Sequence, residues 1–217
     1  MKWGAIMERI EVNKKSRKTR SDKKRDIKPT VSTSLKDCIY RLSYITNTPV
    51  KDVAEVICEK GLESRKVMDY LSNYFRRDLR FRNTWYIGDL ERESLQRKYQ
   101  SKTNERITIR FKQSVYENIA ALSVALDVTP SKATALLLDA SIRNMNVLNA
   151  YVKRYLHDHI DQVRMKELKQ VLKYINKNNP YNEEISWFAL LSLIVEDFKE
   201  STHNIKENIH KWMDKYK

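Results

Sequence analysis

The side chains best suited to bind a charged ligand lie between residues 106 and 112, where polar and apolar residues alternate strictly. Ile107, Ile109 and Phe111 share one parity, and three cations and a threonine share the other. A period of two with β-branched and aromatic residues predicts a half-buried strand. Its polar face would present the kinds of side chain that reach phosphates and base edges. These polar residues are Arg106, Thr108, Arg110 and Lys112.

Two helical patterns follow this strand. Apolar residues recur at helical spacing over 115–126, with Ser114 as a candidate N-cap. The pattern then breaks and restarts at Thr129 and Pro130, which suit the N-cap and the first helical position. We therefore expect a second helix from Ala133 to about Ile142.

This order of strand, helix, tight turn and Thr-Pro-capped helix resembles the ribbon-helix-helix (Arc/MetJ-like) family of DNA-binding proteins. The resemblance covers residues 106–142. A second copy is expected at 27–62, where the alternating stretch 27–32 precedes a helix that starts at Ser34. A constant offset that places Ser34 on Ser114 aligns the copies once one residue is deleted in the turn, which predicts a tandem repeat.

The resemblance implies that two strands pair antiparallel and fit the DNA major groove. The two copies could pair with each other in one chain or with their twins in another chain, and the sequence leaves both open. The predicted base-reading residues are Arg106, Thr108, Arg110 and Lys112, with Lys28, Thr30 and Ser32 in the first copy. The predicted phosphate-binding residues, at the starts of the second helices, are Thr48, Lys51, Thr129, Ser131 and Lys132.

Composition also favours an anionic partner. The chain has 217 residues and a formal net charge of +14. A basic run without periodic apolar residues predicts that residues 1–26 form a disordered arm that follows DNA phosphates. Only three glycines occur, which argues against glycine-rich nucleotide loops. Cys38 and Cys58 fall at apolar helical positions, so we expect buried thiols.

The predicted fold is mainly α, with two ribbon-helix-helix motifs and a C-terminal helical region. Between the motifs, a helix is expected over 63–82, with an arginine cluster at its end and a turn at 84–89. From about Asn144 the apolar spacing predicts one long helix or two. The expected order is an arm at 1–26, motifs at 27–62 and 106–142, a helical connector at 63–105, and a C-terminal domain at 143–217.

The resemblance implies a sequence-specific double-stranded DNA-binding protein that regulates transcription or a mobile element such as a plasmid or phage. The tandem arrangement also resembles plasmid relaxosome accessory proteins, and repressors use the same fold. An antitoxin-like or partition-type protein, whose C-terminal helices bind a protein partner, is the alternative, and nonspecific packaging of nucleic acid is a third. We expect no enzymatic activity, cofactor or metal, a cytoplasmic, nucleoid-associated location without a membrane span, and possible self-association through the C-terminal helices.

Overall fold

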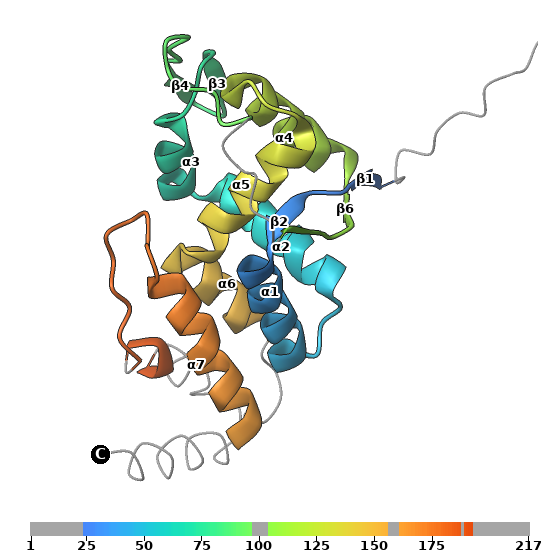
Figure 1. The fold of residues 1–217 in the computed structure, drawn as a ribbon, viewed down its shortest axis with the longest axis vertical. Helices are drawn as coiled ribbons and strands as arrows, with labels where there is room; N and C mark the ends of the chain where they lie inside the picture. Colours follow the sequence, from blue (N-terminus) through green and yellow to red (C-terminus); the bar gives the residue numbers. More distant parts are fainter. Residues whose placement is uncertain (1–23, 97–103, 156–160, 188, 193–217) are drawn as a thin grey trace, which may run out of the picture.

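The computed structural model describes residues 24–96, 104–155, 161–187 and 189–192 (Figure 1). Within these residues the chain is mainly helical, and its strands form three short antiparallel pairs. The predicted mainly α class is therefore confirmed. The apolar side chains of the described elements form one continuous core.

Two strand-helix-helix units form the centre of the molecule. The first consists of β1 (Arg25–Ile27), β2 (Thr30–Ser32), α1 (Thr33–Thr46) and α2 (Val50–Glu63). The second consists of β5 (Asn104–Arg106), β6 (Ile109–Phe111), α4 (Gln113–Leu126) and α5 (Pro130–Ile142). The helix starts in the two units are related by the same constant offset as the sequence copies. The first helix of each unit ends in a left-handed residue, Asn47 with φ 50° and Asp127 with φ 55°. The units thus repeat the same local geometry.

The helix starts differ in part from the sequence prediction. Thr129 caps α5 as expected, because its side chain accepts a hydrogen bond from the backbone N–H of Lys132 at 3.3 Å. The predicted cap at Ser114 is wrong: the N-cap of α4 is Lys112, whose side chain makes no capping bond. In the first unit the corresponding cap is Ser32, which accepts from the backbone N–H of Leu35 at 3.2 Å.

The predicted deletion in the turn of the first unit is also wrong. Pro49 is the N-cap of α2, whereas Pro130 is the first residue of α5. The two prolines are therefore not equivalent, although the helices that follow them keep the constant offset. A sequence comparison that aligns the prolines introduces a gap that the backbone does not have.

The strands of the two units pair with each other within the chain. β1 pairs antiparallel with β6, and β2 pairs antiparallel with β5. One register runs through both pairs, with Asp26 opposite Arg110 at one end and Thr30 opposite Arg106 at the other. We call this two-stranded structure, formed by 25–32 and 104–111, the ribbon. Its pairing answers the question that the sequence left open.

The ribbon buries the side predicted from the period-two pattern. Ile107, Ile109 and Phe111 are all buried, and the last two are fully inaccessible to solvent. The predicted continuous strand is interrupted at Ile107 and Thr108, opposite Pro29. Because proline has no N–H, one bond of the ladder cannot form there. The Ile107 N–H still donates to the Pro29 carbonyl at 3.2 Å and keeps the register.

Equivalent residues of the two units meet at two places. Helices α2 and α5 approach closely at Gly61, where a Cβ atom would lie 2.8 Å from the Cβ of its equivalent, Ser141. In the ribbon, the register places Lys28 opposite its own equivalent, Thr108. Contact between equivalent residues is the arrangement of two subunits around a twofold axis. The chain therefore has the organisation of a dimer folded from one polypeptide.

The connector between the units contains a hairpin that the sequence did not predict. The expected helix over 63–82 is replaced by α3 (Arg65–Ser72), followed by β3 (Leu79–Phe81) and β4 (Thr84–Tyr86). The backbone leaves the helical path because the N–H groups of Arg76 and Arg77 donate to the carbonyl of Ala125, at 2.7 and 3.0 Å. The connector is thereby fixed to the C-terminal end of α4.

The described part of the C-terminal region packs on the two units. It contains two helices, α6 (Met145–Tyr155) and α7 (Gln162–Asn176), and α7 lies along α1 (Figure 1). The hydroxyls of Thr46 and Tyr151 hydrogen bond at 2.8 Å in the buried contact with α6, and Arg41 of α1 forms an ion pair with Glu167 of α7. These helices share the core of the units.

Candidate nucleic-acid interface

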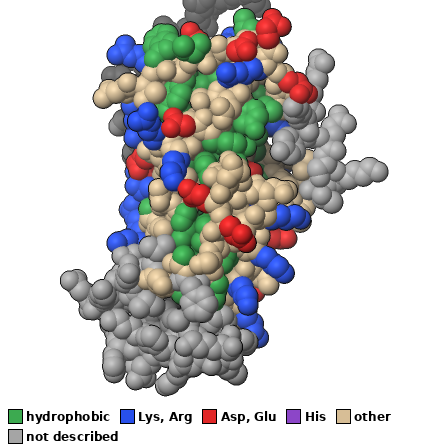
Figure 2. All heavy atoms as spheres, turned by 90° about the vertical axis from the view of Figure 1, so that its left-hand side faces the viewer, with side chains coloured by type: hydrophobic (Ala, Val, Ile, Leu, Met, Phe, Trp, Pro, Cys, Tyr) green, Lys and Arg blue, Asp and Glu red, His purple; other side chains and the backbone are tan. Residues whose placement is uncertain are grey.

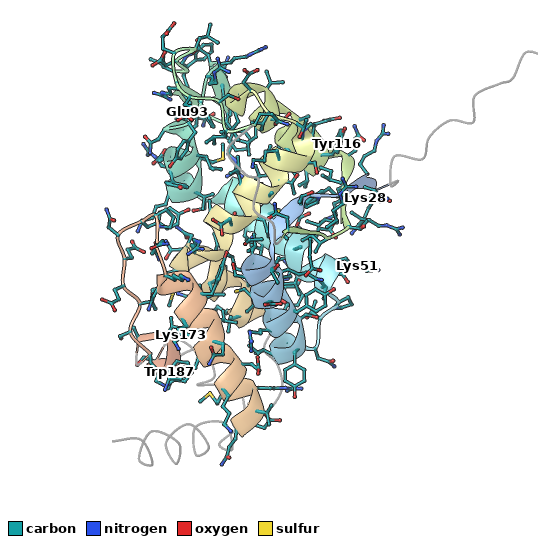
Figure 3. All side chains as sticks on the ribbon, in the orientation of Figure 1. Lys28, Lys51, Glu93, Tyr116, Lys173 and Trp187 are labelled. Carbon is teal, nitrogen blue, oxygen red and sulfur yellow. The ribbon has the colours of Figure 1, made fainter. Side chains whose placement is uncertain are left out.

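The outward face of the ribbon is exposed and carries mostly polar and cationic side chains. Alternation along the strands turns these side chains away from the buried side, and all six are exposed. Lys28 projects on the side of the molecule where β1 and β6 lie (Figure 3). The six residues, which we call the ribbon face, are Asp26, Lys28 and Thr30 on the first strand and Arg106, Thr108 and Arg110 on the second.

The two ends of the ribbon face are chemically different. At one end the carboxylate of Asp26 lies opposite Arg110, and its Oδ1 is 3.2 Å from the arginine Nε. At the other end Arg106 lies opposite the hydroxyl-bearing Thr30. Both arginines belong to the second unit. They lie toward opposite ends of its strand, so each end of the ribbon face has one guanidinium group.

Two predicted base-reading residues lie at the margins of the ribbon face. Ser32 is half-buried, caps α1 and has its hydroxyl 3.1 Å from that of Ser34. Lys112 is exposed, but it is the N-cap of α4 and follows the last strand residue.

The third outward position of the first strand belongs to Asp26, which the sequence analysis placed in the arm. Extending the period-two pattern by one residue at the N-terminal side would have found it.

The second helices begin beside the ribbon. A hollow of about 370 Å³ separates the start of α2 from the second strand, between Val50 and Lys51 on one side and Arg106 and Thr108 on the other. Lys51 is exposed and points outward on the same side as Lys28 (Figure 3). A cation therefore stands at this helix N-terminus, where free backbone N–H groups favour anions.

The start of α5 lies beside the first strand in the corresponding way. Ser131 donates its hydroxyl to the carbonyl of Lys28 at 2.6 Å, which ties the helix to the ribbon. A hollow of about 490 Å³ lies here and is lined by Thr30, Thr129 and Lys132, among others. Lys132 is half-buried, and its burial lowers the pKa of its ammonium group from the usual value. The predicted phosphate-binding residues of the second unit are thus brought together at one edge of the ribbon.

Thr48 differs from its predicted counterpart Thr129. Its hydroxyl donates to the carbonyl of Thr46 at 3.1 Å and does not cap α2. Of the two phosphate-binding residues predicted for the first unit, Lys51 has the exposed position and Thr48 stabilises the turn.

Part of the connector's arginine cluster has a structural role. Arg76 and Arg77 both form ion pairs with Asp127, at 2.6 and 3.0 Å. Arg76 also donates to the carbonyl of Leu90.

The side of the molecule shown in Figure 2 has acidic and basic side chains close together, so that face is not uniformly cationic.

Within the described residues, the side chains that could support other chemistry are buried or do not form a cluster. Cys38 and Cys58 are free and buried, as predicted, and burial raises the pKa of both thiols. Within the described part of the chain, no group of three His, Cys, Asp or Glu residues could hold a metal ion. All four histidines, and residues 1–23 of the predicted arm, lie outside the described residues.

Among the described residues, no single helix is long and apolar enough to cross a membrane. Helices α4 and α5 have the required length and apolar character only when the bent pair is counted together. Comparison with protein-family models, curated proteins and solved structures finds no match to this chain.

Proposed function

We propose that this chain is a ribbon-helix-helix DNA-binding protein that inserts its ribbon into the major groove and binds a specific sequence. The observation that carries the proposal is a two-stranded antiparallel ribbon with a buried apolar side and an exposed face bearing Lys28, Arg106 and Arg110. The major groove admits a two-stranded ribbon, and arginine can bind guanine O6 and N7 together. The role that we propose is that of a transcriptional or mobile-element regulator in the cytoplasm.

The positions of the second helices support the same function. The N-termini of α2 and α5 lie beside opposite strands of the ribbon, with Lys51 and Lys132 next to them. When the ribbon is in the groove, these N-termini face the phosphates on its two sides. Phosphate contacts fix orientation, and the ribbon face reads the bases between them.

One chain supplies both strands, so we propose that a single chain forms one complete DNA-binding unit. The described helices α6 and α7 bury apolar residues against α1, α2 and α5, so they offer no observation that favours the antitoxin-like or partition-type alternative. Double-stranded DNA is the partner that we propose.

Replacing Arg110 by alanine should lower affinity for the preferred DNA sequence by about 1–3 kcal/mol and relax the preference at one or two base pairs. The preferred sequence can be selected from random duplexes and used in competition binding against random DNA. Arg80→Ala is the matched control, because Arg80 is an exposed arginine of β3 outside the ribbon and its removal changes the charge equally. Equal losses on specific and random duplexes for Arg110→Ala would contradict base reading.

Deleting residues 1–23 should weaken binding to all sequences alike. The reason is charge, because this segment is rich in lysine and arginine. Each phosphate that is no longer neutralised makes the negative slope of log K against log salt shallower by about 0.9. The deletion stops before Lys24, because Lys24 forms an ion pair with Glu55 at 2.6 Å and Arg25 belongs to β1. A salt titration with specific and random duplexes measures the effect, and a loss confined to the specific duplex would contradict it.

A further inference from the structure

The contact between Asp26 and Arg110 makes one end of the ribbon face different from the other. The side chains of Asp26 and Arg110 are 47% and 59% exposed, so the pair lies at the surface that faces the groove in the proposed function. Neighbouring charged residues have other partners: Lys24 pairs with Glu55, and Glu105 pairs with Lys36. Asp26 is therefore the carboxylate that faces Arg110.

We propose that Asp26 is a specificity-determining residue that orients Arg110 and makes the preferred DNA site non-palindromic. The inference rests on the proposed DNA-binding function. The ion pair joins Oδ1 of Asp26 to Nε of Arg110 at 3.2 Å, which leaves the terminal Nη1 and Nη2 groups to bind guanine O6 and N7. The carboxylate has no donor of its own, so it favours a base next to that guanine that offers an amino group, such as cytosine N4, over one that offers only acceptors.

The other end of the ribbon provides the internal comparison. By the offset between the units, the pair Asp26–Arg110 is equivalent to the pair Arg106–Thr30. The strand pairing is the same at both ends, and an arginine is present at both. The ends differ because Arg110 is equivalent to Thr30 and Arg106 to Asp26, so the two arginines do not occupy equivalent positions, and the residue facing the arginine is Asp26 at one end and Thr30 at the other. Base preference at the two ends should differ for this reason.

The double variant Asp26→Arg, Arg110→Thr tests the proposal because it places the same side chains at the equivalent positions of both ends. The full chain is first used to select its preferred site from random duplexes, and two palindromes are then built from the two halves of that site. The wild-type chain should bind its selected site about 10-fold more tightly than either palindrome. The double variant should shift the preference to the palindrome built from the half read by Arg106, whereas Asp26→Thr alone should relax the preference in the half read by Arg110. Thr30→Ser, which keeps the hydroxyl, should retain the wild-type preference.

A double-mutant cycle separates orientation from general charge effects. The effects of Asp26→Ala and Arg110→Ala on specific affinity should be strongly non-additive, whereas those of Asp26→Ala and Arg106→Ala should multiply independently. Additive effects with Arg110, together with an unchanged preference in Asp26→Thr, would overturn the role of Asp26 and leave the proposed function intact. A wild-type chain without any sequence preference would overturn the proposed function and this inference together.

Discussion

Replacing Phe111 by alanine should lower the free energy of unfolding by about 3–5 kcal/mol, the usual cost of deleting a fully buried aromatic ring. Phe111 has no exposed surface, and its strand β6 lies against α2 of the other unit. The ring therefore helps to hold the two units together as well as to anchor the ribbon. Because folded domains are stable by only about 5–15 kcal/mol, such a loss is a large share of the total.

Urea denaturation followed by circular dichroism measures this change, with the midpoint and the slope fitted separately. Thr108→Ala is the matched control, because Thr108 is exposed on the opposite side of the ribbon and its replacement should change stability by less than about 0.5 kcal/mol. If Phe111→Ala were as stable as Thr108→Ala, the apolar side of the ribbon would not be part of the core. Arg110→Ala should resemble Thr108→Ala in stability while it loses DNA specificity.

The sequence predicted the ribbon's buried side because side-chain parity in a strand is fixed by backbone geometry alone. Ile107, Ile109 and Phe111 needed no tertiary information to be assigned to one face. The cap at Thr129 was predictable for a similar reason, since its hydrogen bond to Lys132 joins residues within one helical turn. These two features arise within a short stretch of chain and were recovered, although the equally local cap predicted at Ser114 was wrong.

Features that depend on distant partners were not recovered. The pairing of the two units within one chain depends on contacts between residues far apart in the sequence, which local periodicity does not record. The sequence analysis placed Asp26 in the basic arm, because only the strand register shows that it lies opposite Arg110. The helix expected beyond Ser72 gave way to a hairpin because Arg76 and Arg77 bond to the end of α4.

The internal twofold arrangement also explains why glycine is needed at position 61. On that axis equivalent residues face each other directly, so the two side chains must share the space of one. The chain has Gly61 in α2 and the small Ser141 in α5, whose hydroxyl is turned to the carbonyl of Leu137 at 2.5 Å. Close approach of two helices requires small residues at the crossing point, and it makes this point intolerant of added volume.

Replacing Gly61 by valine should therefore lower the free energy of unfolding by about 3 kcal/mol, at the upper end of the usual range for overpacking a core. A Cβ at this position would lie 2.8 Å from the Cβ of Ser141 and 3.3 Å from Cδ1 of Leu137, so the branched side chain must push α2 away from α5. Separation of these helices also disturbs the ribbon, because β6 rests on α2. Urea denaturation measures the loss, and Lys51→Val, on the exposed side of α2, is the control for the new side chain.

A compensating change distinguishes a steric effect of the close approach between α2 and α5 from a general cost of placing valine in this helix. Gly61→Ala alone should destabilise the protein despite alanine's advantage of about 1 kcal/mol in helix propensity, because its Cβ still meets Ser141. Adding Ser141→Gly removes that contact and should restore stability by about 1 kcal/mol or more relative to Gly61→Ala. Since the two positions are equivalent in the two units, the double variant moves the glycine from one side of the axis to the other. Purely additive effects of the two substitutions would show that α2 and α5 do not meet there, and the single-chain dimer arrangement would fail with them.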